Sequence, residues 1–383
     1  MHLFDVYPLF EIEPVRGEGF YVYDKKGQSY LDLYGGHAVI SIGHSHPHYR
    51  QRISQQLSQL GFYSNSVQNS LQPALAKKLG ELSGCEDYQL FLCNSGAEAN
   101  ENALKLASFH TGKTKIITFE KAFHGRTSAA VNITDKDKIK APINKLFEAE
   151  FHEWNNLTTV EESLQKGDVC AVIIEGIQGI GGIHIPTPNF LECLAQLCKK
   201  YNAILILDEI QSGYGRSGHF FAFQTANIQP DIITVAKGMG NGFPIGGVLI
   251  HPKFKPSYGL LGTTFGGNHL ACAAGLAVLE VIEQENLIEN SAIIGAYFKS
   301  ELEKIKGIKA VRGNGLMIGL DLGFPIKDIR KQLLYEKHIF TGSSSDPNVM
   351  RLLPPLTITK KEVDYFINKL KLVLETYKVS KTL

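Results

Sequence analysis

The chain has 383 residues, of which 44% are hydrophobic and 20% charged, and its formal net charge is +1. A chain of this length can bury the cores of two or three packed units, and its composition is that of a folded globular protein, not a disordered one. Because acidic and basic residues balance without forming blocks, the charge gives no reason to expect nucleic acid or an anionic membrane as a partner.

The features that indicate a cellular compartment favour the cytoplasm. Residues 1–5 lack the charged and apolar regions of a secretory signal, and no apolar stretch is long enough to cross a bilayer. The six cysteines are scattered, and several lie inside apolar runs. We interpret them as buried free thiols of a reducing compartment, since a disulfide framework is typical of small secreted chains.

Residues 1–45 are expected to form a small N-terminal segment. Turn signals at residues 16–19 (Arg-Gly-Glu-Gly) and 24–27 (Asp-Lys-Lys-Gly) separate aromatic-rich, strand-like stretches within it. A large domain is expected to follow over residues 46–270, and a smaller C-terminal domain over residues 271–383.

Short apolar runs alternate with helical patterns between residues 85 and 250. The runs are rich in Ile and Val and do not alternate with polar residues, which is typical of strands buried on both faces. They predict an α/β fold in which a mostly parallel sheet lies between helices. The runs are Leu90–Cys93, Lys115–Phe119, Ala171–Ile174, Ala203–Leu207, Ile232–Ala236 and Gly247–Ile250.

The helix expected before residue 201 carries clear boundary signals. Thr187 can cap its N-terminus and Pro188 suits its first position. Its inward stripe consists of Leu191, Leu194, Leu197 and Cys198.

From about residue 270 the pattern changes to that of a smaller α+β unit. Ala271–Glu285 is expected to be a linking helix, followed by strands at Leu316–Leu320 and Val349–Leu353. A last helix is expected over Lys361–Tyr377, with its apolar residues on one face.

Polar residues follow the first of the predicted strands of the large domain. Ligands of open parallel sheets bind at the carboxyl ends of the strands, so these positions are candidates for a site. Ser95 and Glu98 have capping-box spacing, and the amides of Gly96 and Ala97 would face an anion at the start of a helix. The pattern is compatible with a phosphate site and with an ordinary capped helix.

Two charged residues follow the ends of other buried strands. Asp208 could hold a protonated heterocycle nitrogen, because a partly buried carboxylate favours a cationic partner, or it could only cap a turn. Lys237 is costly at the end of a buried strand unless it is paired or used covalently, and a lysine with a lowered pKa suits Schiff-base chemistry. Each residue alone is also compatible with a structural position.

Longer motifs occur in a characteristic order along nearly the whole chain, and Asp208 and Lys237 stand 29 residues apart within it. Together they resemble the fold-type I pyridoxal-phosphate enzymes, and most closely the class III aminotransferases of the acetylornithine aminotransferase group. The motifs are residues 31–33 (Leu-Asp-Leu), 43–47 (Gly-His-Ser-His-Pro), 94–100 (Asn-Ser-Gly-Ala-Glu-Ala-Asn), 122–127 (Ala-Phe-His-Gly-Arg-Thr), 208–213 (Asp-Glu-Ile-Gln-Ser-Gly), 236–238 (Ala-Lys-Gly) and 262–268 (Gly-Thr-Thr-Phe-Gly-Gly-Asn).

The resemblance implies a seven-stranded sheet and a pyridoxal 5'-phosphate cofactor held by this chain. Lys237 would carry the cofactor as a Schiff base and later shuttle a proton, and Asp208 would keep the pyridinium nitrogen protonated. Phe123 would stack on the ring, and Gln211 would contact its phenolic oxygen. The phosphate would be held by Gly96, Ala97 and Thr264, the last from a neighbouring subunit, so a homodimer with a shared active site is expected.

The resemblance also implies how substrates are held. Arg126 would bind the α-carboxylate of the amino donor and Arg351 that of 2-oxoglutarate, because the planar guanidinium matches a carboxylate bidentately. Thr263 and Glu175 are expected to line the substrate site as well. The implied reaction moves the terminal amine of N2-acetylornithine or N2-succinylornithine to 2-oxoglutarate, giving the semialdehyde and glutamate, in arginine metabolism.

The sequence departs from the family pattern at two positions. Many relatives have a glutamate where this chain has Ile180, and that glutamate pairs with the arginine matched by Arg351 while the distal-amine donor binds. Because Ile180 cannot form this ion pair, either another group gates Arg351 or the two donor classes are separated less strictly. Ornithine aminotransferases that use the free α-amine carry a tyrosine near His37, so its absence favours an N-acylated donor.

Other functions remain open at this point. Within the family's chemistry these are ornithine aminotransferase, 4-aminobutyrate aminotransferase and glutamate-semialdehyde aminomutase. A metal-dependent hydrolase would use His44, His46 and His48 as ligands, although Pro47 favours a turn there. A regulatory protein on a disabled enzyme fold would be expected to lack Lys237 or Asp208, and both are present.

Overall fold

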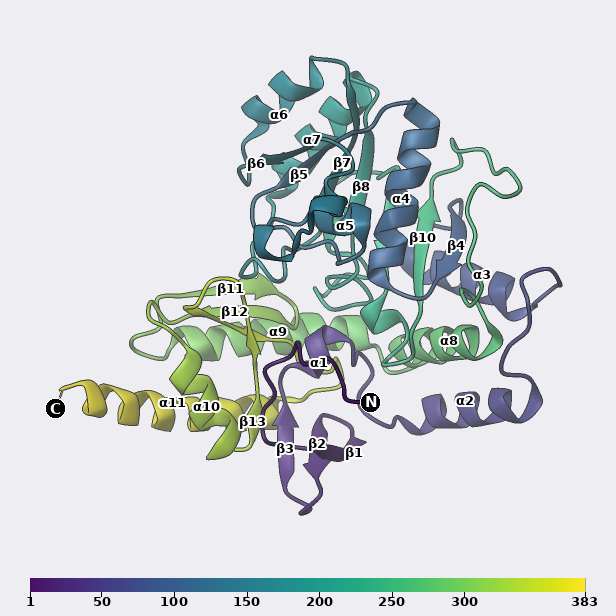
Figure 1. The fold of residues 1–383 in the computed structure, drawn as a ribbon. Helices are drawn as coiled ribbons and strands as arrows, with labels where there is room; N and C mark the ends of the chain where they lie inside the picture. Colours follow the sequence, from purple (N-terminus) through teal and green to yellow (C-terminus); the bar gives the residue numbers. More distant parts are fainter. Residues whose placement is uncertain (383) are drawn as a thin grey trace.

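The computed structural model describes residues 1–382, and its largest feature is a seven-stranded sheet between helices (Figure 1). β10 is antiparallel to both its neighbours, whereas the other neighbouring strands of this sheet run parallel. The predicted α/β class and mostly parallel sheet are therefore confirmed. In spatial order the strands are β4 (Gln89–Cys93), β10 (Gly246–Ile250), β9 (Ile232–Val235), β8 (Ile204–Asp208), β7 (Val169–Glu175), β5 (Lys115–Phe119) and β6 (Ala149–His152).

All six strands expected from apolar runs are present, and their ends differ from the expected ones by at most two residues. The strand that the sequence analysis missed is β6, which lies at the edge of the sheet and pairs only with β5. Because most of its residues are half-buried, β6 does not need the continuous apolar run that marks the central strands.

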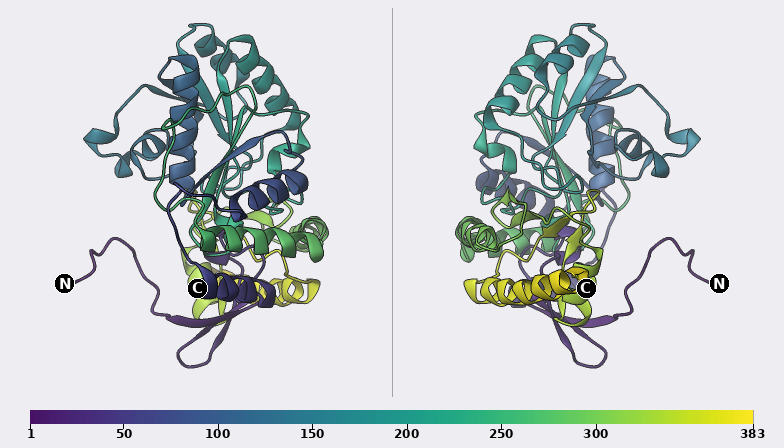
Figure 2. Two further views of the ribbon diagram at one scale, coloured as in Figure 1. Left: turned by 90° about the vertical axis from the view of Figure 1, so that its right-hand side faces the viewer. Right: turned by 90° about the vertical axis from the view of Figure 1, so that its left-hand side faces the viewer.

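Helices cover both faces of this sheet (Figure 2). Along β8, Ile204 and Ile206 pack in a core cluster with residues of α4, whereas Leu205 and Leu207 pack in the cluster that contains residues of α7. Successive strand residues point to opposite faces, so one apolar run serves both cores. The helices are α4 (Gly96–Thr111), α5 (Ser128–Asn132), α6 (Leu157–Leu164) and α7 (Pro188–Lys200).

α7 begins as its sequence predicts. The Thr187 side chain accepts a hydrogen bond from the Phe190 amide at 3.2 Å, and Pro188 occupies the first helical position. A cap of this kind stabilises a helix by about 1 kcal/mol.

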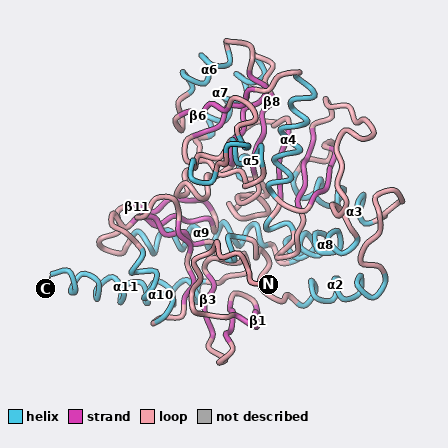
Figure 3. The backbone as a smooth tube through the Cα atoms, in the orientation of Figure 1, coloured by secondary structure: helices cyan, strands magenta, loops and turns pink. Residues whose placement is uncertain are grey.

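A second sheet forms the core of the smaller C-terminal unit, and Figure 3 shows it apart from the large sheet. Its strand order is β11-β12-β15-β14, with all pairs antiparallel. The expected α+β character is confirmed. The elements are α8 (His269–Gln284), α9 (Leu287–Glu303), β11 (Ala310–Asn314), β12 (Met317–Asp321), α10 (Lys327–Tyr335), β14 (Gly342–Ser343), β15 (Val349–Leu352) and α11 (Lys360–Thr382).

The N-terminal strands join a strand from the C-terminal part of the chain. β3 pairs in parallel with β13, so the third sheet has the order β1-β2-β3-β13. The division of the chain at residues 45 and 270 stays a prediction. The elements are β1 (Pro14–Glu18), β2 (Tyr21–Asp24), β3 (Ser29–Asp32), α1 (Gly35–Ala38), α2 (Pro47–Gln59), α3 (Leu71–Ser83) and β13 (Ile339–Phe340), and short 3-10 turns lie at Asp137–Ile139, Pro142–Asn144, Ala222–Thr225 and Lys237–Met239.

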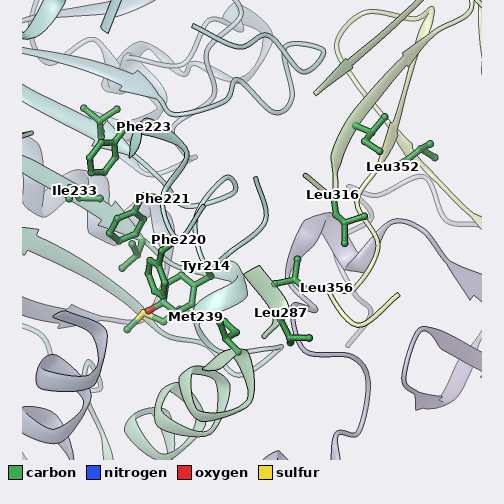
Figure 4. Packing of buried hydrophobic residues seen from close by; sticks show 14 of the residues in the cluster. Tyr214, Phe220, Phe221, Phe223, Ile233, Met239, Leu287, Leu316, Leu352 and Leu356 are labelled. Atoms are coloured by element: carbon green, nitrogen blue, oxygen red, sulfur yellow. The ribbon is translucent and has the colours of Figure 1, made fainter. Parts of the chain in front are cut away.

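The apolar core continues from the large sheet into the C-terminal unit (Figure 4). The segment after β8 contributes aromatic side chains to it, and the rings of Phe220 and Phe221 meet edge to face with centroids 4.9 Å apart. On the far side Leu316 and Leu356 belong to the same cluster. Because the core spans both units, the residues between β8 and β9 are held firmly against the sheet.

The six cysteines form no disulfide, and all but Cys193 are buried. Burial raises the pKa of the Cys170 thiol, so it stays neutral and apolar in the core. Within residues 1–382, no helix is both long and apolar enough to cross a membrane.

Candidate active site

The ends of β7, β8 and β9 bring together the main candidates of the sequence analysis. Glu175 and Asp208 are the last residues of β7 and β8, and they lie opposite each other in the strand register. Lys237 follows β9 by two residues. Parallel strands end at the same edge of the sheet, and this is where ligands of such folds bind.

The Asp208 carboxylate is 4% exposed and is held by three donors. One oxygen, Oδ2, is bonded to His124 Nδ1 at 2.8 Å and to Asn100 Nδ2 at 2.9 Å, and Oδ1 accepts from the Ile210 amide at 3.1 Å. A buried carboxylate fixed in this way keeps a lone pair for a further cationic donor, such as a protonated ring nitrogen.

Asn100 and His124 orient this carboxylate and are themselves held. Asn100 Oδ1 accepts from Thr234 Oγ1 at 2.8 Å, and His124 Nε2 lies 3.2 Å from Thr118 Oγ1. Asn100 belongs to the motif at residues 94–100, but no role for it was expected from the sequence. The sequence signal for such a role was the position of Asn100 in the motif at residues 94–100, one helical turn after the start of α4.

Lys237 has no ion pair with the other residues in the range 1–382, and its backbone φ is 44°, a left-handed value that a side chain disfavours. Loss of solvent around the amino group lowers the pKa of Lys237, and the charge of Arg351 acts in the same direction, whereas Asp208 and Glu175 oppose it. A lowered pKa raises the fraction of free amine, which is the form that attacks a carbonyl carbon.

Glu175 supports the loop that carries Phe123. Its Oε1 accepts from the Phe123 amide at 3.1 Å and its Oε2 from the Gly179 amide at 2.9 Å. Burial raises the pKa of Glu175 to about 7. Glu175 was expected to line the substrate site. Its carboxylate instead faces the backbone amides of Gly179 and of the half-buried Phe123.

This raised pKa predicts a pH-dependent effect of Glu175→Gln on stability. With a pKa of about 7 in the folded state against an ordinary value of 4.5, the native protein binds the proton more tightly, so the glutamate costs stability as pH rises through that window. The free energy of unfolding of the variant should therefore rise relative to that of the wild type, by up to about 3 kcal/mol between pH 5 and pH 8. Denaturant unfolding at both pH values measures it, with surface Glu86→Gln as the control for the substitution itself, and a difference independent of pH would contradict it.

The start of α4 is built as a capped helix. Ser95 Oγ accepts from the Glu98 amide at 3.2 Å, and the Glu98 carboxylate accepts from the Asn94 amide at 2.8 Å. A side chain on Gly96 would meet Ile210, since a Cβ there would lie 2.8 Å from its methyl carbons. The expected phosphate contact of Gly96 and Ala97 stays a prediction. The close approach of Ile210 is by itself a reason for a glycine at position 96.

Thr263 and Thr264 lie in the loop before α8. Thr263 Oγ1 accepts from Asn94 Nδ2 at 3.3 Å, so this loop is tied to the start of α4 within the same chain. Thr264 is exposed. The expected role of Thr264 in a neighbouring subunit's site stays a prediction.

The two arginines differ in their surroundings. Arg351 on β15 is 3% exposed, and its guanidinium donates to Ser343 O at 2.6 Å and to Gln211 Oε1 at 3.1 Å. Arg126 is exposed and makes no hydrogen bond or ion pair with any other described residue. Gln211, expected at the cofactor's phenolic oxygen, donates here from Nε2 to His37 O at 3.0 Å.

The alternate histidines near residue 46 bind three different carboxylates. His44 lies 2.9 Å from Asp32 and His46 lies 2.8 Å from Glu285, while His48 is paired with Glu280. Each imidazole thus has a carboxylate partner of its own, which does not favour a shared metal site at this turn.

Comparison with known proteins agrees with this constellation. The family model described as aminotransferase class-III matches residues 5–374. The chain belongs to the class-III aminotransferase family. It is 42% identical to the acetylornithine aminotransferase of Bacillus subtilis, over 96% of each chain, and 43% identical to that of Archaeoglobus fulgidus, over 95% of this chain and 96% of the relative.

A solved structure shares the fold over nearly the whole chain. It is an ornithine aminotransferase from Toxoplasma gondii, described with partial occupancy of pyridoxal phosphate at its active site. The TM-score is 0.88 at 30% identity, and the match covers 97% of this chain and 92% of that one. As a class-III member, this protein is a pyridoxal-phosphate-dependent aminotransferase, a transferase that requires an amino donor and a keto-acid acceptor.

The residues at the strand ends fit that cofactor chemically. Asp208 is a buried carboxylate with a free lone pair, and Lys237 is an amine of lowered pKa without an ion-pair partner among residues 1–382. Glu175 holds the loop of Phe123, the aromatic side chain available for stacking. A carboxylate, an amine and an aromatic ring are the groups a protonated pyridine aldehyde needs.

Proposed function

We propose that this aminotransferase moves the terminal amine of an N2-acylated ornithine, N2-acetylornithine or N2-succinylornithine, to 2-oxoglutarate, giving the semialdehyde and glutamate in arginine metabolism. The observation that carries the proposal is the buried Arg351, whose charge is close enough to Lys237 to lower its pKa. A guanidinium at this position is suited to hold the carboxylate of a keto acid beside the reacting amine. The relatives named acetylornithine aminotransferase support the choice of donor.

When bound, pyridoxal phosphate supplies an electron-withdrawing ring that stabilises negative charge on a substrate carbon. Lys237 Nζ would take the proton from the carbon bearing the terminal amine and return it in the transfer, a contribution on the order of 10²–10⁴-fold. Asp208 would keep the proton on the ring nitrogen, with Asn100 and His124 fixing its carboxylate. Gly96, Ala97 and Thr264 are proposed to hold the phosphate.

The carboxylates of the two substrates would be bound by the two arginines. Arg126 is solvent-exposed and without a partner among the described residues, so its guanidinium is free for the α-carboxylate of the donor. Arg351 would take that of 2-oxoglutarate. His37, in place of the tyrosine of ornithine aminotransferases, supports a donor whose α-amine is acylated.

We propose that the active unit is a homodimer in which Thr264 reaches the partner's site. Exposed aromatic side chains gather around the Thr264 loop, where the rings of Phe62 and Phe265 lie 5.3 Å apart. Tyr63 and Tyr258 are exposed as well. Exposed aromatic side chains of this kind are often covered by a partner, and a twofold interface would bury them on both copies.

The N-terminal residues support the same proposal. Residues 1–9 extend away from the body of the chain (Figure 2), and Leu3 and Phe4 are 98% and 90% exposed. An arm this apolar is expected to pack on a second copy.

The unpaired cysteines support a reducing compartment, and we propose the cytoplasm.

Steady-state rates with four donors test the substrate assignment. N2-acetylornithine or N2-succinylornithine should show a kcat/KM at least about tenfold above ornithine and 4-aminobutyrate, because one well-placed contact with the acyl group is worth about 1–3 kcal/mol. Arg126→Ala should lower kcat/KM for the acylated donor by about 10²-fold, since a charge-assisted hydrogen bond contributes about 1.5–3 kcal/mol.

The same measurements separate the alternatives. A preference for free ornithine would identify an ornithine aminotransferase instead. Activity with 4-aminobutyrate that Arg126→Ala leaves intact would identify a 4-aminobutyrate aminotransferase, since that donor has no α-carboxylate. Isomerisation of glutamate semialdehyde without a keto acid would identify the aminomutase.

A further inference from the structure

Thr264 lies at the exposed tip of a tight turn. Thr263 Oγ1 accepts from the Gly266 amide at 3.2 Å, which closes the turn around Thr264 and Phe265. Gly266 is buried, and a Cβ on it would lie only 2.8 Å from Cys93 Cα, so this side of the turn packs directly against the end of β4. Thr264 and Phe265 are exposed, so the turn presents their side chains away from its own chain.

The inner side of this turn is held by a side-chain amide. Asn65 Nδ2 donates to Thr263 O at 3.3 Å and to Gly266 O at 3.1 Å, so one amide group spans the turn. Asn65 is itself oriented, because its Oδ1 accepts from Gln72 Nε2 at 2.9 Å. Since its oxygen is bonded to Gln72, the amino group of Asn65 faces the two carbonyls.

Two more side-chain amides hold the residue that follows the turn. Asn69 Nδ2 donates to Gly267 O at 3.1 Å, and Gln72 Nε2 donates to the same oxygen at 2.9 Å. Asn65, Asn69 and Gln72 thus form an amide clamp on the loop, from the segment that leads into α3. Side-chain donors of this kind fix a loop whose carbonyls have no helix or strand to pair with.

The amide clamp holds the loop and no other part of the candidate site. Within residues 1–382 its side chains make no hydrogen bond to Lys237, to Asp208 or to the start of α4. The loop is tied to the start of α4 separately, by Asn94 Nδ2, which donates to Thr263 Oγ1 at 3.3 Å. The clamp therefore fixes the backbone on both sides of Thr264 and leaves the side chain of Thr264 free.

We propose that the amide clamp acts in trans: the clamp of one subunit positions Thr264 for the cofactor phosphate of its partner. Each cofactor site then depends on the clamp of the other copy. The inference rests on the proposed homodimer and on the proposed phosphate contact of Thr264. A loop that is fixed before it meets the phosphate loses little conformational freedom on binding. Without the clamp, cofactor binding would have to order the loop, which lowers the affinity.

Heterodimers of full-length chains with two different affinity tags separate effects in cis from effects in trans. One subunit carries Lys237→Ala, so that only the other, the reporter subunit, can bind pyridoxal phosphate covalently at residue 237. Asn65→Asp keeps the size of the side chain but replaces its amino donor by an oxygen. It is placed either on the Lys237→Ala subunit, in trans, or on the reporter subunit, in cis.

The readout is cofactor binding and requires no turnover. Cofactor-free heterodimers are equilibrated with increasing concentrations of pyridoxal phosphate and reduced with borohydride. Mass spectrometry then gives the fraction of reporter chains labelled at residue 237, and from it the dissociation constant of that one site.

Asn65→Asp in trans should raise the dissociation constant at least about fivefold, because a hydrogen bond to a charged group such as phosphate contributes at least that ratio. In cis the same change should leave the dissociation constant within about twofold. Gln72→Glu should give the same pattern, and it replaces Asn65→Asp if that variant does not fold. Asn189→Asp, an identical change on the exposed first turn of α7, should alter the constant in neither arrangement.

Thr264→Ala on the Lys237→Ala subunit separates the contrary outcomes. If it weakens cofactor binding by the reporter subunit, but the clamp variants do not do so in trans or do so equally in cis, the inference is wrong and the shared site stands. If Thr264→Ala in trans leaves the dissociation constant unchanged, or if the two chains form no heterodimer, the proposed shared site is wrong and the inference fails with it.

Discussion

Replacement of Lys237 by alanine is expected to lower the transamination rate by about 10⁴-fold, the upper end of what a positioned acid–base group contributes, since the same amine also serves as nucleophile. The structure supplies the reason. Lys237 is the amine at the carboxyl end of β9, its pKa is lowered by desolvation, and it forms no ion pair within residues 1–382 that would hold its proton.

Lys253→Ala is the matched control for this change. Lys253 follows the antiparallel strand β10 and pairs with Asp231. It therefore lies near the amino end of β9, whereas Lys237 lies at the carboxyl end of that strand. Its replacement should leave the rate within about twofold, since surface substitutions away from functional groups change stability by only about 0.5 kcal/mol. Mass spectrometry after borohydride reduction should find the cofactor on wild-type protein at residue 237 and none on Lys237→Ala. A variant that keeps its rate, or a cofactor attached to another lysine, would contradict the assignment.

Replacement of Asp208 by asparagine is expected to lower the rate on the order of 10²–10⁴-fold. The amide is nearly the same size and can still accept from His124 or Asn100, so packing is preserved. The negative charge that would hold a proton on the ring nitrogen is lost, and with it the electron-withdrawing power of the ring.

Asp231→Asn provides the same chemical change near the amino end of β9, away from the candidate site. Asp231 accepts from the Leu205 amide at 2.9 Å and pairs with Lys253, away from Asp208. Rates and cofactor dissociation constants should be measured for both variants. Equal effects of the two substitutions would show that Asp208 matters only as a structural carboxylate.

The central strands were predictable because they are buried on both faces. β7 and β8 have no exposed residue, so continuous apolar runs were required at these positions and marked the strands in the sequence. β6 lies at the edge of the sheet, where a continuous apolar run is not required. Its polar and apolar residues therefore gave no signal for a strand. The cap at Thr187 was predictable for a different reason, since it depends on residues adjacent in sequence.

That Asp208 and Lys237 lie at the same end of the sheet was predictable from topology, since one ends and the other follows neighbouring parallel strands. The contacts of Gln211 were not, because they join residues that are 140 and 174 positions away. The left-handed turn at His37 was equally hidden, since its sequence offers two glycines but a histidine and an alanine share the conformation.

The absorbance spectrum of the purified, cofactor-loaded protein tests the central claim most directly. The protein is titrated with N2-acetylornithine, and separately with N2-succinylornithine, without any keto acid. The account predicts that the band of the Lys237-bound cofactor is lost with at least one donor and returns on addition of 2-oxoglutarate. A band that responds to neither donor would contradict the substrate assignment, and the absence of any such band would contradict the site built on Lys237.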